Sequence, residues 1–303
     1  MSPVPEVAGG FAGAAVRVAT PLLLAATGEL IAERAGVINL SIEGAMLCGA
    51  LGAAIAGVSG GPWLGLFCAM LAGMVLAALF AAVAVGAGAD QIISGTAFTL
   101  LATGLTGAVY RRVFGSAGSG LSLRTFGAVE MPLLKTIPIL GPGLFSQPVV
   151  TYLAMLAVPT AWWALYRTRA GLALRATGES TEAAMAAGLP VRTIRTIAVV
   201  IGGGMAGLAG GSLVLAQVGT FAEQMTAGRG FIAIAIVVLG GWQPFRVALA
   251  ALLFGAASAL QFVFQSLGLA VPYQLFLMLP YVLTLLALGG MVGRVRAPAG
   301  LGK

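Results

Sequence analysis

The chain lacks histidine altogether and has only two cysteines and few charged residues. Without histidine it can build neither a histidine-based metal site nor a serine–histidine–aspartate catalytic triad. Cys48 and Cys68 both lie within apolar runs, which favours small buried side chains over a disulfide or metal ligands. Charged residues make up 8% of the chain, whereas a soluble domain carries about 25%. The sequence therefore lacks the polar surface that a water-soluble globule needs.

Apolar residues take their place, with 59% hydrophobic residues in a chain of 303. A membrane-spanning helix needs about 20 predominantly apolar residues. Long apolar runs cover residues 10–27, 37–58, 62–89, 92–114, 148–166, 197–218, 247–267 and 271–291, and a shorter one covers residues 231–239. We expect an all-α, polytopic integral membrane helical bundle with about nine segments (eight to ten), one of them short or broken. Nothing resembling a linker divides the chain, so residues 1–303 are expected to form a single transmembrane domain.

Basic residues at the ends of the apolar runs predict the orientation, because cytosolic loops are enriched in arginine and lysine. Arg167, Arg169, Arg175, Arg192 and Arg195 flank the polar segment 174–190 and place it in the cytosol, and Arg294, Arg296 and Lys303 place the C-terminal region there too. The N-terminus is then expected outside. Arg111 and Arg112 fall on the outer side, which the rule disfavours. The net charge of +7 comes from such flanking positions and does not indicate a nucleic-acid partner.

Two longer polar stretches interrupt the apolar pattern. Residues 115–147 are rich in glycine, serine and proline, and we expect an extracytoplasmic loop that contacts an external partner or caps the bundle. Residues 168–196 are expected to form a cytoplasmic loop around a short helix. Ser180 suits the N-cap of that helix, Glu182 its first turn and Gly188 the position after its end. Such an alanine-rich helix could dock into a groove on a cytosolic partner or belong to an ordinary loop.

Four sequence segments resemble motifs of one family of membrane proteins. Glu182-Ala183-Ala184, followed after three residues by Gly188, resembles the EAA loop of ABC-transporter permeases. Residues 28–44, 89–95 and 228–233 resemble motifs of the importer permeases for simple sugars and nucleosides, and they occur in the order typical of that family. The resemblance covers most of residues 15–290. It is greatest to the shorter of two paired permeases that work with a basic-membrane-protein-type binding lipoprotein.

The resemblance implies a function and a set of partners. The chain is expected to be the permease subunit of an ATP-driven importer, without enzymatic activity, that moves a nucleoside or related solute inward by alternating access. ATP and magnesium would be bound by a separate ATP-binding subunit and no cofactor by this chain, which has no GxxxxGK[ST] phosphate-binding motif. A second homologous permease (a heterodimer), an extracytoplasmic substrate-binding protein and the lipid of a bacterial cytoplasmic membrane complete the expected surroundings. Coupling to the ATPase is expected at Ser180, Glu182, Ala183, Ala184 and Gly188.

Two other functions compete with this interpretation. A simple sugar such as a pentose could replace the nucleoside as the transported solute. Alternatively, the chain could be an ion-coupled secondary transporter in which Glu29, Glu43 or Asp90 carries protons. An intramembrane enzyme is disfavoured, because no cluster of polar catalytic residues occurs.

Polar residues within or beside the apolar runs are the candidates for the substrate pathway. Asn39 and Glu43 are four residues apart, which predicts one helix face lining the path, unless Glu43 pairs with Arg34 or caps a broken helix. Asp90 and Gln91 either line the path or cap the helix that follows.

A second pair of candidates surrounds the short apolar run. Glu223 and Arg229 flank residues 231–239, and Gly228 and Gly230 enclose Arg229. A short, glycine-hinged half-helix is typical of a midplane or gate element in transporters, although the same pattern also serves packing.

Overall fold

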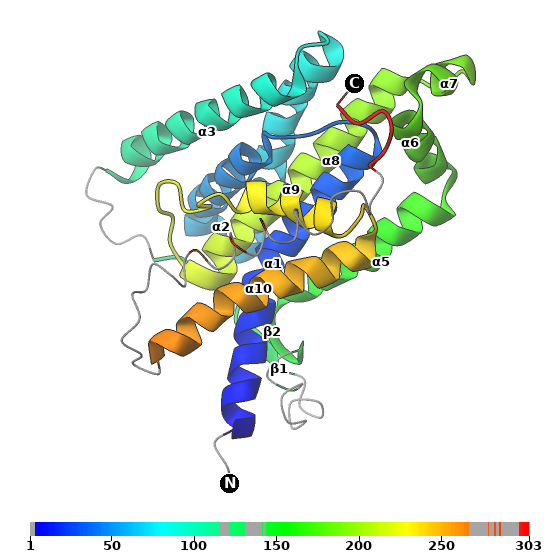
Figure 1. The fold of residues 1–303 in the computed structure, drawn as a ribbon. Coiled ribbons are helices and arrows are strands. Elements are labelled where there is room, and N and C mark those ends of the chain that lie inside the picture. The colour runs from blue at the N-terminus through cyan, green and yellow to red at the C-terminus, as the bar shows by residue number, and fades with distance from the viewer. Residues whose placement is uncertain are drawn as a thin grey trace.

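The computed structural model describes residues 4–115, 122–130, 144–266 and 297–302, together with residues 141, 278, 282 and 285. Most of the described residues are helical, which confirms the expected helical membrane bundle (Figure 1). The helices are α1 (Val4–Arg34), α2 (Ile42–Ala81), α3 (Gln91–Phe114), α5 (Val149–Arg167), α6 (Arg169–Glu179), α7 (Thr181–Ala186), α8 (Val191–Ser212), α9 (Arg229–Leu239) and α10 (Pro244–Ser266). Short π-helices, η1 (Ala82–Gly86) and η2 (Leu213–Val218), extend α2 and α8.

Five of the described helical segments are long and apolar enough to cross a membrane. They cover residues 8–34, 42–86, 91–114, 149–167 and 191–218. The second combines two predicted apolar runs, because the chain continues as helix on both sides of a kink at Gly61, where φ is 76°, and Pro62. Glycine reaches that backbone conformation without steric cost. The apolar run 271–291 lies outside the described residues except at three positions.

The centre of the bundle is the packing of α2 against α8. Both helices bring glycine to the contact, and small residues let helix backbones approach closely in a membrane. A Cβ atom on Gly210 would lie 1.8 Å from the carbonyl oxygen of Met46, and one on Gly207 would lie 2.2 Å from that of Ala69. The close approach of these backbones therefore leaves no room for a side chain at either position.

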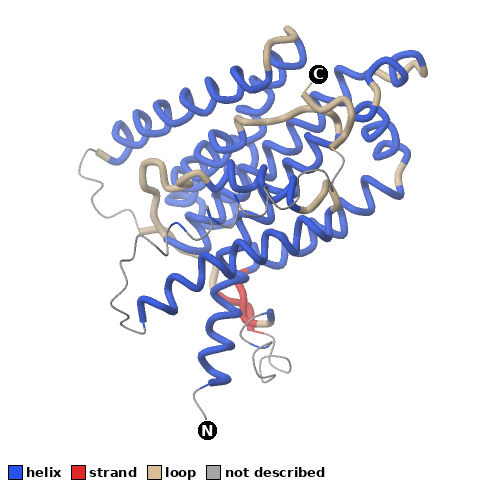
Figure 2. Tube along the Cα trace, in the orientation of Figure 1, coloured by secondary structure: helices blue, strands red, loops and turns tan. Residues whose placement is uncertain are grey.

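The described residues of the two polar stretches lie toward opposite ends of the bundle (Figure 1). Strands β1 (Ala128–Glu130) and β2 (Ser146–Pro148) pair antiparallel beside the N-terminal half of α1 (Figure 2). They are an addition to the predicted all-α fold. Helices α6 and α7 and residues 297–302 lie toward the other end of α1 (Figure 1). The C-terminal residues 297–302 lie beside α6, and the sides of the membrane on which residues 115–147 and 168–196 lie stay a prediction.

Candidate coupling and translocation site

Helix α7 forms where the cap residues predicted it. The Ser180 hydroxyl accepts a hydrogen bond from the amide of Ala183 at 3.2 Å, and Glu182 lies in the first turn. The helix ends before Gly188, whose φ of 77° is one that glycine adopts readily. The preceding helix, α6, was not predicted; the Thr168 hydroxyl accepts from the Gly171 amide at 3.0 Å and caps its start.

The exposed face of α7 is narrower than the sequence suggested. Glu182, Ala183 and Gly188 are exposed, as is Met185. Ala184 is only 3% exposed, since its side chain packs back against the protein. The Ala184 methyl group therefore packs α7 against the bundle, and the role of Ala184 in coupling stays a prediction.

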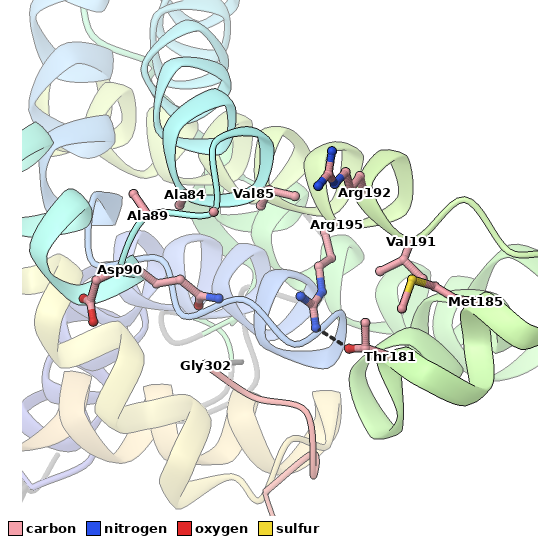
Figure 3. A pocket seen from close by; sticks show the side chains of 12 residues that line it. Ala84, Val85, Ala89, Asp90, Thr181, Met185, Val191, Arg192, Arg195 and Gly302 are labelled. Carbon is pink, nitrogen blue, oxygen red and sulfur yellow. Dashed lines mark hydrogen bonds between the residues drawn. The ribbon is translucent and has the colours of Figure 1, made fainter.

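A pocket of about 380 Å³ lies beside α7 (Figure 3). Thr181 and Met185 of α7, Arg192 and Arg195 of α8, and the turn before α3 line it, as does Gly302. Arg195 is 9% exposed and donates to the Thr181 hydroxyl at 2.8 Å and to the carbonyl oxygen of Ala35 at 3.2 Å. This arginine, absent from the sequence-based candidates for the site, joins the first residue of α7 to the end of α1.

Four glycines from three distant parts of the chain meet next to this arginine. The Gly300 amide donates to the carbonyl oxygen of Gly178 at 2.8 Å, and the Gly302 amide donates to that of Gly36 at 3.1 Å. A Cβ atom on Gly178 would lie 2.2 Å from the carbonyl oxygen of Arg34. The end of α6, the end of α1 and the C-terminal segment are therefore in backbone contact.

Residues 35–41, which link α1 to α2, contact a motif segment that is distant in the sequence. Gln91 accepts a hydrogen bond from the amide of Ile38 at 2.8 Å. The Thr99 hydroxyl donates to the carbonyl oxygen of Leu40 at 2.9 Å, and a Cβ atom on Gly95 would lie 2.7 Å from the Leu40 Cβ. The start of α3 is thus packed onto this link.

Glu43 joins the same region to the start of α9. Its carboxylate accepts hydrogen bonds from the Thr226 hydroxyl at 2.6 Å, the Gly228 amide at 2.8 Å and the Gly230 amide at 2.6 Å. Glu43 is 6% exposed and caps the half-helix α9, one of the two structural alternatives considered for it. Arg34 does not pair with Glu43 but donates to the carbonyl oxygen of Trp242 and to the Tyr166 hydroxyl.

Asn39 and Glu43 do not share a helix face, which corrects the prediction from their spacing. Helix α2 begins only at Ile42, and Asn39 lies in the preceding link. The Asn39 side-chain oxygen accepts from the amide and the hydroxyl of Ser41, which turns the chain into the helix. Asn39 is fully buried.

Buried carboxyl groups on α1 also surround the link. Glu29 accepts from the Asn39 amide at 2.9 Å, and Glu33, one turn later, accepts from the Trp242 indole. Both glutamates are at most 1% exposed. Among the described residues, Glu29 Oε2 and Asn39 Nδ2 find no hydrogen-bond partner. The fold therefore buries both carboxyl groups of α1 beside the link.

The remaining candidates, Asp90, Glu223 and Arg229, cap helix ends or lie away from residues 35–41. Asp90 accepts from the amides of Ile92 and Ile93, each at 2.9 Å, and so caps α3. Glu223 forms an exposed ion pair with Arg111 at 2.9 Å at the opposite end of α3. Arg229 donates to the carbonyl oxygens of the turn that precedes it. That turn contains two non-glycine residues with positive φ, Gln224 and Ala227, so its backbone is strained next to α9.

Residues 11–288 match a protein family described as the permease component of the branched-chain amino acid transport system. The chain is similar to TsgC13 of Haloferax volcanii, a permease named for glucose transport, with 45% identity over 87% of this chain and 80% of the relative. It is also similar to the guanosine ABC transporter permease NupQ of Bacillus subtilis, with 38% identity over 92% and 91%. The nucleoside ABC transporter permease NupC of Lactococcus lactis is 34% identical over 92% and 91%.

Proposed function

We propose that this chain, which belongs to the family of branched-chain amino acid transport system permease components, moves a nucleoside or a related small solute across the membrane. Like other permeases of this family, the chain is the membrane-embedded translocation subunit of an ABC transporter and not an enzyme. NupQ and NupC, each aligned over nine tenths of this chain, support the nucleoside. TsgC13 supports a sugar as the second candidate. We propose inward transport across the cytoplasmic membrane of a bacterium.

The family implies an ATP-hydrolysing subunit and a substrate-binding protein as partners. We propose that ATP and magnesium are bound by the ATPase alone and that α7 is the surface it contacts. The supporting observation is that α7 is short, capped and exposed, yet tied by Arg195 to α1. Exposed bulky residues on α3, including Ile93 at 70% and Leu100 at 73%, support a second permease packed on that helix.

The contacts suggest how movement of α7 would reach the membrane interior. Arg195 connects α7 with the end of α1, and the link that follows leads to Glu43. Glu43 in turn holds the start of α9. We propose that α9 is the gate of the pathway, because a broken helix with a strained approach is typical of transporter binding regions.

Measurement of ATP hydrolysis by the complex purified through this chain tests the proposed function. With the binding protein present, guanosine and other nucleosides are expected to stimulate hydrolysis and glucose or pentoses are not. Stimulation by sugars alone would show that the transported solute is a sugar and not a nucleoside. A complex that hydrolyses ATP but responds to neither class would contradict both substrates.

Replacing Ala183 with arginine tests whether α7 is the docking surface. The new side chain projects from an exposed position, so the permease is expected to keep its thermal stability. We expect nucleoside-stimulated ATP hydrolysis to fall about tenfold or more, because the guanidinium would separate two surfaces that must fit closely. Thr125→Arg, exposed at the opposite end of the bundle, is the matched control. Wild-type stimulation by the Ala183→Arg protein would exclude docking through this face.

A further inference from the structure

A long apolar groove of about 560 Å³ lies on the side of the bundle between α5, α6 and α8, with α1 behind it. Leu156 on one wall and Ile197 on the other are 62% and 53% exposed. Most of the remaining lining is alanine, leucine and isoleucine. In a membrane-embedded chain this groove faces hydrocarbon or another protein.

The polar groups of the groove are already used within the protein. Thr27 donates its hydroxyl proton to the Leu23 carbonyl oxygen at 2.7 Å, and Thr160 donates to that of Leu156 at 2.8 Å. Thr168 donates to the Ala164 carbonyl oxygen and accepts from the Gly171 amide. A solute rich in hydroxyl groups would lose its bonds to water here without replacement, whereas an alkyl chain would lose nothing.

Two arginines flank one end of the groove, and the guanidinium of one of them, Arg167, lies 5.4 Å from the centre of the Trp162 ring. Thr168, which lines the groove, stands between Arg167 and Arg169, both exposed. Within the described part of the chain the only salt bridge is Arg111–Glu223, so neither arginine has a carboxylate partner there. The nearest acidic residue in α6, Glu179, is at the other end of that helix, about 15 Å away at 1.5 Å per residue.

We propose that this groove binds an anionic phospholipid, with an acyl chain between α5 and α8 and its phosphate at Arg167 and Arg169. The apolar groove would hold the acyl chain, and the two arginines at its end would lie where the headgroup phosphate of the same lipid is. The start of α6 adds amide groups that favour an anion beside the two arginines. Basic sites between transmembrane helices on the cytosolic side are suited to anionic headgroups.

A lipid fits this groove better than the second permease does. A protein helix seated there would bring the two arginines into its interface and would need carboxylates of its own to pair with them. An anionic lipid of the cytosolic leaflet brings its own phosphate to the two arginines, so no protein carboxylate is needed. The exposed apolar face of α3 lies elsewhere on the bundle and is free for the second permease (Figure 1).

Native mass spectrometry of the purified full-length chain tests the proposal. After delipidation, the protein is offered phosphatidylglycerol or phosphatidylcholine with identical acyl chains. We expect phosphatidylglycerol to be retained more than about tenfold over phosphatidylcholine, and we expect a double Arg167→Ala, Arg169→Ala variant to lose this preference. Arg112→Ala, an exposed arginine at the end of α3, should keep it. Equal retention of the two lipids by the unmodified chain would overturn the proposal.

A variant that fills the groove tests the acyl-chain part separately. Ala157 lines the groove and is half-buried, so Ala157→Trp is expected to abolish retention of both lipids. Leu172→Trp, on α6 but outside the lining, should retain them. Unchanged retention in a folded Ala157→Trp protein would overturn the proposal. Cross-linking of an Ile197→Cys variant to a second permease in native membranes would also overturn the proposal. If the Ala157→Trp protein does not fold, the arginine variants still test the proposal.

Discussion

Replacing Glu43 with alanine is expected to abolish transport and to lower the stability of the permease by about 3 kcal/mol or more. The carboxylate accepts from one hydroxyl and two backbone amides in a buried environment. Its removal would leave the amides of Gly228 and Gly230 without a partner and release the start of α9. Thermal unfolding of the purified chain measures the stability, and nucleoside uptake by the reconstituted complex measures transport.

Two matched variants separate this role from a general effect of charge. Glu43→Gln keeps one acceptor oxygen but turns a donor toward the second amide, so we expect an intermediate loss of stability. Glu223→Gln removes a carboxylate whose ion pair with Arg111 is exposed, and such pairs contribute about 0–1 kcal/mol. If Glu43→Ala and Glu223→Gln shift the unfolding temperature equally, Glu43 does not anchor α9.

Features that depend on neighbouring residues could be predicted from the sequence. Ser180 and Gly188 correctly marked the ends of α7, and Asp90 was correctly considered as a cap of α3. The short apolar run after Gly230 became the half-helix α9. Caps and glycine turns act within one helical turn, so the local sequence carries their signal.

Features that depend on distant contacts could not be predicted in this way. The spacing of Asn39 and Glu43 suggested one helix face, but the start of α3 packs on the link through Gln91 and Thr99, and α2 begins only at Ile42. Ala184 looked available for docking because nothing in its neighbours indicates which side of α7 packs on the bundle. The burial of Glu29 follows from helices that lie far away in the sequence.

The assembly of the motifs around residues 35–41 gives those distant contacts a functional meaning. Residues of the first signature segment contact Gln91 in the second and Gly230 in the third. The same link receives Arg195 from the coupling side. A resemblance in sequence showed that these segments occur together, and the structure shows that a single stretch of chain connects the proposed docking helix with the proposed gate.

Replacing Gly178 with alanine is expected to uncouple the permease. A Cβ atom there would lie 2.2 Å from the carbonyl oxygen of Arg34 and 3.1 Å from the amide nitrogen of Gly36. Both neighbours are backbone atoms that cannot rotate away, so α6 would have to move off the end of α1. We expect a destabilisation of about 1–3 kcal/mol and a loss of nucleoside-stimulated ATP hydrolysis and uptake, while basal hydrolysis by the complex persists.

The loss of coupling is expected to be larger where the added Cβ atom has less room. A Cβ atom on Gly300 would lie 2.8 Å from the Gly178 carbonyl oxygen, so Gly300→Ala is expected to impair coupling less than Gly178→Ala. Gly104→Ala is the control, because nothing lies within 4 Å of its Cβ position on α3, and alanine favours helix over glycine. Full nucleoside stimulation in the Gly178→Ala complex would mean that the contact between α6 and α1 does not transmit the movement of α7. In that case Arg195 would remain the connection to test, because it reaches the end of α1 independently of Gly178.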